Sequence, residues 1–171
     1  MELKLNRFDP LSPIKVFDEP GNYLFCLREN SKLPEISITP IMLEFEKLKV
    51  VYTGITGRSL QSRDSQQHFN GNAEGSTIRK SFGSLFGFKR QFYFNKGKKK
   101  KWKYNASDEM ELSIWMKNNL ILFFMKAQDY YTIENILINH FNPPLNLKGN
   151  KNEINKLFRR ELKRLRNKKD D

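Results

Sequence analysis

Five polar side chains on separate stretches of the sequence have the chemistry that a phosphate group requires: Tyr23, Tyr52, Arg63, Glu134 and Asn146. Hydrolysis of a phosphodiester needs a deprotonated water, a cation on the phosphoryl oxygens and help for the leaving oxygen. One carboxylate can hold a Mg²⁺ ion that keeps most of its waters, an arginine can neutralise developing charge, and a tyrosine near the metal can serve as base. Each residue also has a plainer interpretation: tyrosines on strands are usually core aromatics, and a glutamate in a first helical turn is usually a surface acid.

Several other kinds of site are not indicated by the sequence. The single cysteine, Cys26, lies in the apolar run YLFC, and neither a CxxC pair nor a histidine cluster occurs, so no zinc site or disulfide is expected. Neither a GxxxxGK[ST] phosphate loop nor a GxSxG nucleophile turn is present. The start, MELKLNRFDP, does not resemble a signal peptide, and the longest apolar run, LILFFM, is too short to span a bilayer. We therefore expect a cytoplasmic protein.

The composition favours a polyanionic partner. The chain has 31 Lys and Arg against 19 Asp and Glu, a net charge of +12, which attracts nucleic acid or an anionic membrane surface. Basic residues concentrate in NKGKKKKWKY, in the C-terminal segment and beside the apolar stripe of the helix expected after Ser76. The predicted nucleic-acid contacts are Arg79, Lys80, Lys98, Lys99, Lys100, Lys101, Trp102, Arg159, Arg160 and Lys163. Trp102 and Tyr104 could stack on unpaired bases, whereas the alternative is a set of cations that only stay in water.

The hydrophobic pattern predicts an α/β domain with a small sheet covered by helices. Buried strands are expected at 23–27, 49–55 and 120–127. Helices are expected at 60–69 after Ser59, after Ser76, after Ser107 or Asp108, after Thr132, and at about 153–166. We expect a single domain over 1–171, with an inserted loop at 28–48, a basic aromatic insert at 89–105 and a basic amphipathic C-terminal helix within 151–171.

Four segments taken together resemble the GIY-YIG nuclease superfamily: GNYLF, VYTG, SLQSR and ENILINHFNPPLN. GNY at 21–23 stands for the first tripeptide, YTG at 52–54 for the second, and 60–63 for the L-x-x-R helix. Glu134 corresponds to the later glutamate of the family and Asn146 to the asparagine after the proline. The resemblance covers residues 21–146.

The resemblance implies a three-stranded central sheet flanked by helices and a cation-dependent nuclease. Glu134 would bind one Mg²⁺ or Mn²⁺ per active site, and Arg63 would contact the scissile phosphate. Tyr23 and Tyr52 would line the site, one as general base and the other positioning water or phosphate, and which does which stays open. Asn146 would orient the site through its amide.

The sequence departs from the family pattern in several places. Asn22 replaces an apolar residue in the first tripeptide, which predicts less secure packing of that strand, and Ile55 stands where many relatives carry a lysine. The long span between the two tripeptides predicts a loop that bulges outward. His68 follows Arg63 by five residues instead of four, so a regular helix would turn it ~100° away and place Gln67 on the expected face. His68 stays a candidate catalytic residue, against a simple helix-end histidine.

The favoured hypothesis is a small Mg²⁺-dependent endonuclease, a phosphodiesterase that acts on DNA, most of all duplex DNA. One alternative is a catalytically inactive nucleic-acid-binding protein on the same scaffold, and another is a nuclease for RNA or single-stranded DNA. A membrane-surface role for the C-terminal helix is a distant third, and no membrane partner is expected. The sequence leaves open whether the protein is a homodimer.

Overall fold

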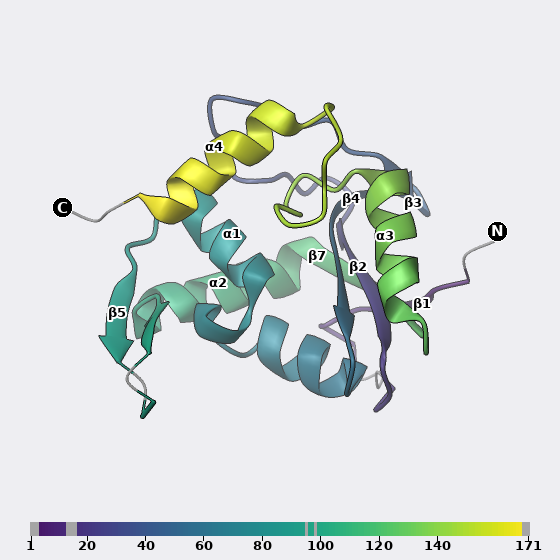
Figure 1. Ribbon diagram of the computed structural model, residues 1–171, viewed down its shortest axis with the longest axis horizontal. Coiled ribbons are helices and arrows are strands. Elements are labelled where there is room, and N and C mark those ends of the chain that lie inside the picture. The colour runs from purple at the N-terminus through teal and green to yellow at the C-terminus, as the bar shows by residue number, and fades with distance from the viewer. Residues whose placement is uncertain (1–3, 13–16, 95, 98, 169–171) are drawn as a thin grey trace.

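The computed structural model describes residues 4–12, 17–94, 96–97 and 99–168. Its centre is a five-stranded antiparallel sheet with the strand order β1-β7-β2-β4-β3, covered by helices on both faces (Figure 1). The strands are β1 (Asn6–Phe8), β2 (Gly21–Leu27), β3 (Glu44–Phe45), β4 (Leu48–Thr56) and β7 (Leu120–Lys126). The fold is therefore mixed α/β, as predicted.

The sheet is wider than the three strands that we expected. The three predicted strands are β2, β4 and β7, and they form the middle of the sheet with β2 between its two neighbours. The additional strands β1 and β3 pair with β7 and β4 at the two edges. They have 3 and 2 residues, too few for a periodic hydrophobic pattern to reveal them.

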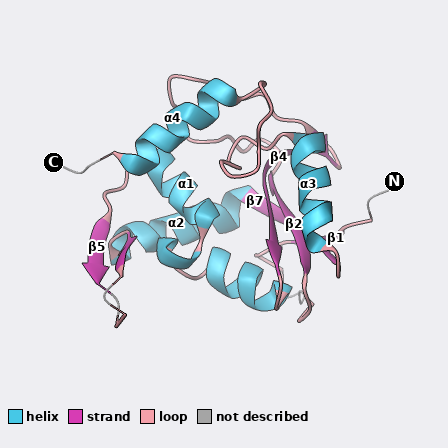
Figure 2. Ribbon diagram, viewed as in Figure 1, coloured by secondary structure: helices cyan, strands magenta, loops and turns pink. Residues whose placement is uncertain are grey.

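Six helical segments lie around the sheet in the described part of the chain (Figure 2). They are the π-helix η1 (Gln61–His68), the 3-10 turn η2 (Ala73–Gly75), α1 (Thr77–Leu85), α2 (Ala106–Asn119), α3 (Tyr130–Phe141) and α4 (Lys156–Asn167). The predicted caps Ser59 and Ser76 are confirmed, since each hydroxyl accepts a backbone N–H of the turn that follows. The predicted caps of the next two helices were wrong, because Asn105 caps α2 and Asp129 caps α3. Asn and Asp are as effective at this position as Ser, and they stand directly before the first turn.

The segment 89–105, predicted as a basic aromatic insert, contains a two-stranded hairpin of β5 (Gln91–Phe94) and β6 (Lys100–Lys103). This hairpin forms a sheet of its own, away from the main sheet on the left of Figure 1. The segment 28–48 is irregular before β3, but it does not simply bulge outward. Leu33 is buried, and Ile36, Ile38 and Met42 pack against the core.

The core has two parts, one on each face of the sheet, which explains why every residue of β2 is buried. Tyr23 and Phe25 point to the face covered by η1, α1 and α2, and Leu24 and Cys26 point to the opposite face, which α3 covers. Asn22 is buried as well, and its amide donates to the carbonyl of Tyr130 at 2.9 Å. This bond ties β2 to the start of α3.

Arg79 lies in the core and not on the surface that we predicted for it. Its side chain is 0% exposed and pairs with Glu109 of α2 at 2.7 Å. Its guanidinium also donates to the carbonyl of His68 and to the hydroxyl of Ser113. Glu109 in turn accepts the backbone N–H groups of Ala73 and Tyr104. The periodicity of α1 did not reveal this burial, because the carboxylate that pairs with Arg79 comes from another helix.

We expect Arg79→Gln to lower the free energy of unfolding by about 3–5 kcal/mol, because it leaves the Glu109 carboxylate buried without its partner. Chemical denaturation followed by circular dichroism measures this change. Arg160→Gln removes the same charge from an exposed position of α4 and serves as the control. Unchanged stability in Arg79→Gln, together with weaker nucleic-acid binding, would contradict the structural role of Arg79.

Candidate active site

Tyr23 and Tyr52 lie on neighbouring strands and point to the same face of the sheet, with ring centroids 6.4 Å apart. Gly54 is the strand partner of Tyr23. A Cβ atom on Gly54 would lie 2.5 Å from the ring and the hydroxyl of Tyr23. The glycine of the YTG segment is therefore required on steric grounds, because the Tyr23 ring lies directly across its backbone.

His68 joins the tyrosines, which the regular-helix argument did not predict. Its Nε2 is 2.9 Å from the hydroxyl of Tyr23, and its Nδ1 is 2.7 Å from the hydroxyl of Ser76. The segment is a π-helix, in which residues five apart stack above one another as residues four apart do in an α-helix. The extra residue between Arg63 and His68 is absorbed in this way. Burial lowers the pKa of His68 well below its usual value, so the ring is neutral.

Arg63 is half-buried on η1. Its Nη1 donates to the side chain of Gln67 at 2.6 Å and to the carbonyl of Gly75 at 3.0 Å. Its buried Nε has no hydrogen-bond partner among the described residues. Arg63 borders an open surface pocket of about 660 Å³, whose lining also includes Thr56, Gly57, Arg58, Ser59, Ser62 and Gln67. Because Gln67 accepts a hydrogen bond from Nη1, it orients the guanidinium of Arg63 beside this pocket.

Electrostatic interactions place Tyr52 among the charged residues of the site. Burial and then the charge of Glu134 raise the pKa of Tyr52 to about 12. The charges of Arg63 and Arg166, and a hydrogen bond with the Thr77 side chain, act in the opposite direction. Side chains from β4, η1, α1, α3 and α4 thus act on one hydroxyl group.

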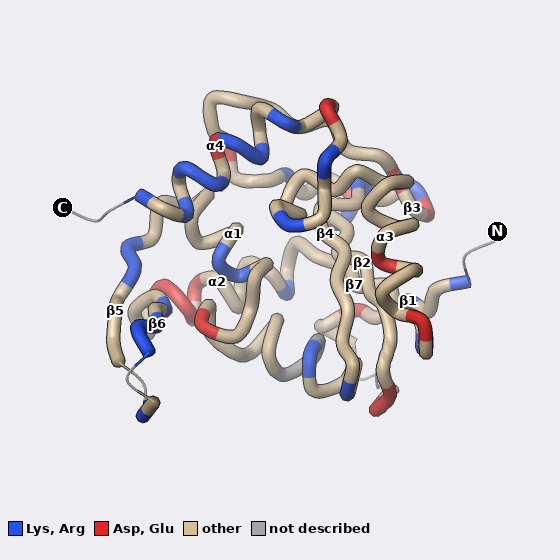
Figure 3. The backbone as a smooth tube through the Cα atoms, in the orientation of Figure 1, with Lys and Arg blue, Asp and Glu red and all other residues tan. Residues whose placement is uncertain are grey.

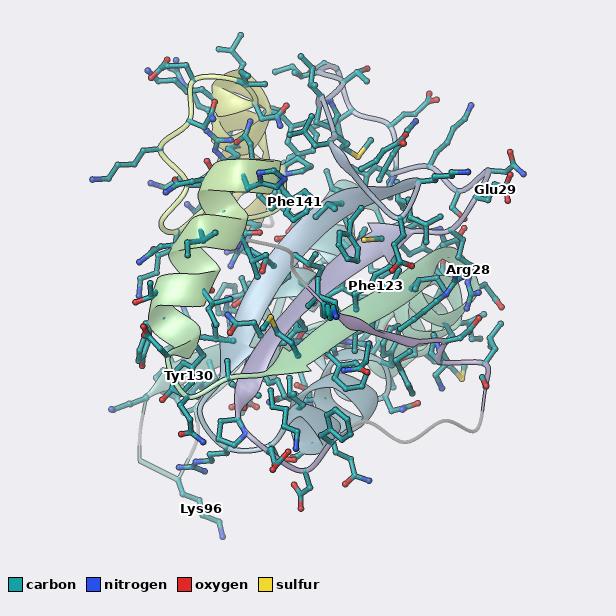
Figure 4. All side chains as sticks on the ribbon, turned by 90° about the vertical axis from the view of Figure 1, so that its right-hand side faces the viewer. Arg28, Glu29, Lys96, Phe123, Tyr130 and Phe141 are labelled. Atoms are coloured by element: carbon teal, nitrogen blue, oxygen red, sulfur yellow. The ribbon has the colours of Figure 1, made fainter. Side chains whose placement is uncertain are left out.

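Glu134 is half-buried on α3, which packs along β4 at the side of the sheet (Figure 4). Burial raises the pKa of its carboxyl above the usual value, and the charge of Lys148 partly offsets this. A carboxylate that is costly to ionise in the free protein gains from a nearby cation.

Asn146 supports the site from the outer edge of β4. Its amide accepts the N–H of Thr53 at 2.9 Å and donates to the carbonyl of Thr53 at 2.8 Å. The N–H of Leu145 adds a bond to the carbonyl of Val51 at 3.1 Å. Because β3 pairs only with the start of β4, the loop that carries Asn146 takes the place of a strand beside the YTG segment.

The predicted nucleic-acid contacts separate into exposed and buried residues. Lys99, Lys100, Arg160 and Lys163 are exposed, and Figure 3 shows basic positions along the hairpin and α4. Arg159 is only 7% exposed and bonds to Asn142 and Asn152, so its predicted surface role was wrong. The cause resembles that of Arg79, since polar partners from a neighbouring loop enclose the guanidinium. Lys98 lies outside the described residues.

The aromatic residues of the hairpin differ from the expectation. Tyr104 is 1% exposed and its hydroxyl donates to the carbonyl of Lys80, so it cannot stack on a base. Trp102 is half-buried, with Lys80 and Arg90 over its ring. The exposed rings are those of Phe92 and Phe94, at 46% and 71%. Lys101 is half-buried and pairs with Glu74 at 3.2 Å.

The geometry agrees with a comparison against known protein families, in which residues 21–168 match the model of the GIY-YIG catalytic domain. The chain belongs to the GIY-YIG family. The match continues past residue 146 and includes α4. Membership implies a nuclease-type phosphodiesterase with a nucleic-acid substrate. No curated protein and no solved structure matches the chain. No helix in the described part of the chain is long and apolar enough to cross a membrane.

GIY-YIG nucleases typically use a divalent metal, and the residues at this site fit an ion that retains its waters. No three Asp, Glu, His or Cys side chains come together within the described residues, so a cage made only of protein ligands is not formed there. Mg²⁺ is commonly bound through one or two carboxylates and keeps several waters. The single carboxylate of Glu134 suits that coordination.

Sequence reasoning did not identify Arg166 as part of the site. Arg166 follows the buried Leu162 by four residues, and Leu162 follows the buried Phe158 by four, so all three share one face of α4. A charged residue that continues a buried stripe was the available signal.

We expect Asn146→Ala to lower the free energy of unfolding by about 2–3 kcal/mol, because both backbone groups of Thr53 lose their partner. Thermal and urea unfolding measure the loss. Asn139→Ala, at an exposed position of α3, should have little effect. Equal stability of the two variants would show that Asn146 does not close the edge of β4.

Proposed function

We propose that the protein is a divalent-cation-dependent endonuclease that cleaves DNA, with duplex DNA as the main substrate. The observation that carries the proposal is that the charges of Glu134 and Arg63 both affect the pKa of the buried Tyr52. A carboxylate for a cation, a guanidinium for a phosphate and a phenol for proton transfer are the groups that phosphodiester hydrolysis needs. The net charge of +12 supports a polyanionic substrate.

Tyr52 is the better candidate for the general base. Its hydroxyl responds to Glu134, Arg63 and Arg166, whereas the hydroxyl of Tyr23 is engaged with the neutral ring of His68. Tyr23 and His68 therefore hold the wall of the site beside Tyr52. Glu134 would hold the cation, which when bound would polarise a water and offset charge on the phosphoryl oxygens. Arg63 adds a positive charge at the border of the open pocket, where its guanidinium can attract a phosphate oxygen.

Cleavage of labelled duplex DNA, single-stranded DNA and RNA in Mg²⁺ tests the proposal. We expect cleavage of DNA that EDTA and Glu134→Gln abolish, while Glu111→Gln, an exposed glutamate of α2, leaves it intact. Tyr52→Phe should lower the rate about 10²–10⁴-fold, as expected when a general base is lost. Tyr23→Phe should have a smaller effect.

Preferred cleavage of RNA would contradict DNA as the main substrate, while the proposal of a nuclease would stand. Binding without cleavage of any polymer would favour a nucleic-acid-binding protein and contradict the proposal.

The rate of cleavage should rise with pH for two reasons. Tyr52 must lose its proton to act as a base, and its pKa lies at about 12 in the protein alone, so the rate should rise with pH through the neutral range. Glu134 must be ionised to hold a cation. Because its pKa is raised, the affinity for Mg²⁺ should begin to weaken at a higher pH, on acidification, than it would with an ordinary glutamate. Rate profiles at several Mg²⁺ concentrations measure both effects. A rate that falls steadily from pH 6 to 9 would contradict the base role.

The exposed rings of Phe92 and Phe94, next to the lysines of the hairpin, favour an additional contact with unpaired bases. Lys100 lies over the Phe92 ring at 4.3 Å, so charge and ring are presented together. We expect Phe92→Ala and Phe94→Ala each to weaken binding of single-stranded DNA by about 1–3 kcal/mol, the usual range for a stacked base. Binding of blunt duplex should change less.

Fluorescence anisotropy with labelled oligonucleotides in EDTA measures these affinities. Ile114→Ala removes an exposed apolar side chain from α2 and serves as the matched control. Equal affinity of all three variants for single strands would rule out stacking on the hairpin.

A further inference from the structure

Two basic side chains, from α1 and from the loop before β5, lie over the ring of Trp102 on β6. The Nζ of Lys80, on α1, lies 5.1 Å from the centroid of the ring, and the Cζ of Arg90 lies 5.7 Å from it. Arg90 also donates a hydrogen bond of 3.0 Å to the carbonyl of Arg166, in the last turn of α4. The end of α4 is thereby fixed beside α1 and the base of the hairpin.

Lys80 and Arg166 are both half-buried, and neither forms an ion pair with a carboxylate among the described residues. Burial lowers the pKa of each, and the charge of Arg166 lowers the pKa of Lys80 further. Glu74 is the carboxylate whose charge acts on Lys80, but it already binds Lys101 and the hydroxyl of Tyr93. Two partly desolvated cations that repel each other are costly, and an anion bound to both would offset that cost.

This pair of cations adjoins the active site. The charge of Arg166 acts on the hydroxyl of Tyr52, the residue on which Glu134 and Arg63 also act. Arg166 continues the stripe of the buried Phe158 and Leu162 on α4, which packs against α1, and these two residues belong to the same core cluster as Tyr52. An anion held here would be a neighbour of the group that is hydrolysed.

We propose that Lys80 and Arg166 form a second phosphate-binding site, which holds a backbone phosphate of the nucleic acid next to the scissile one. A guanidinium can bind two phosphate oxygens in parallel, and an ammonium can add a point charge. Such a contact carries no sequence information, but it fixes the position of the strand relative to Tyr52. The identification of the anion as a nucleic-acid phosphate rests on the proposed function, whereas the grouping of the two cations does not.

Binding of fluorescein-labelled duplex and single-stranded oligonucleotides in EDTA tests the proposal without any cleavage. We expect Arg166→Gln and Lys80→Gln each to weaken binding about tenfold at moderate salt, the loss typical of one hydrogen bond to a charged group. The slope of log affinity against log salt should become shallower by about 0.9 on duplex for each variant. Arg166→Lys should keep the slope of the unmodified protein.

Arg164→Gln is the matched control, since Arg164 is exposed on the same helix and paired with Glu161 at 2.7 Å. Unchanged affinity and slope in Lys80→Gln and Arg166→Gln would overturn the proposal, as would an equal loss in Arg164→Gln or no binding by the unmodified protein. If Arg166→Gln does not fold, Lys80→Gln and Arg166→Lys decide.

The Mg²⁺ cleavage assay separates this proposal from the proposed function. Variants that lose binding in a protein that cleaves nothing would support the phosphate site and contradict the nuclease. Normal binding by the variants, together with DNA cleavage by the unmodified protein, would contradict the phosphate site and support the nuclease.

Discussion

The buried ion pair between Arg79 and Glu109 is the constraint on which the site depends. Arg79 stands in α1 and Glu109 in α2, and their remaining hydrogen bonds reach the end of η1, the turn η2 and the backbone of Tyr104. The carbonyl that Arg79 holds belongs to His68, whose ring meets Tyr23. The position of the wall beside Tyr52 is thus set by a pair of charges that never reach the surface. Such a pair adds little net stability, but its partial loss is costly, which makes the arrangement specific.

Opposing charges act on the hydroxyl of Tyr52. Burial makes its phenol a weaker acid, and the carboxylate of Glu134 strengthens that effect, while Arg63 and Arg166, which lie far apart in the sequence, oppose it. The hydroxyl therefore stays protonated until additional positive charge arrives. A base that becomes active only when a cation is in place would limit unwanted hydrolysis. The departures from the family pattern at Asn22 and His68 do not disturb this balance, since a hydrogen bond to α3 and the wider π-helix accommodate them.

Much of the fold and the site could be predicted from the sequence. The three central strands are apolar runs long enough to recognise, and Ser59 and Ser76 stand where helix caps belong. The burial of Arg79 and Arg159 could not be predicted. Helix periodicity indicates which residues share a face, but not whether a side chain from a distant part of the sequence will pair with one of them. The π-helix was equally hidden, since nothing in a local pattern distinguishes one inserted residue in a helix from a longer loop. The two edge strands were too short to leave a signal, while Arg166 did leave one in its spacing from Leu162.

The central claim is that Tyr52 and Glu134 share one catalytic centre that a cation completes. The most direct test is to follow the ionisation of Tyr52 by NMR of ¹³C-labelled tyrosine, with the signal among the 6 tyrosines assigned through Tyr52→Phe. The account predicts a pKa of about 12 without metal and a clearly lower value with Mg²⁺, and no such decrease in Glu134→Gln. A pKa that Mg²⁺ leaves unchanged in the unmodified protein would contradict it.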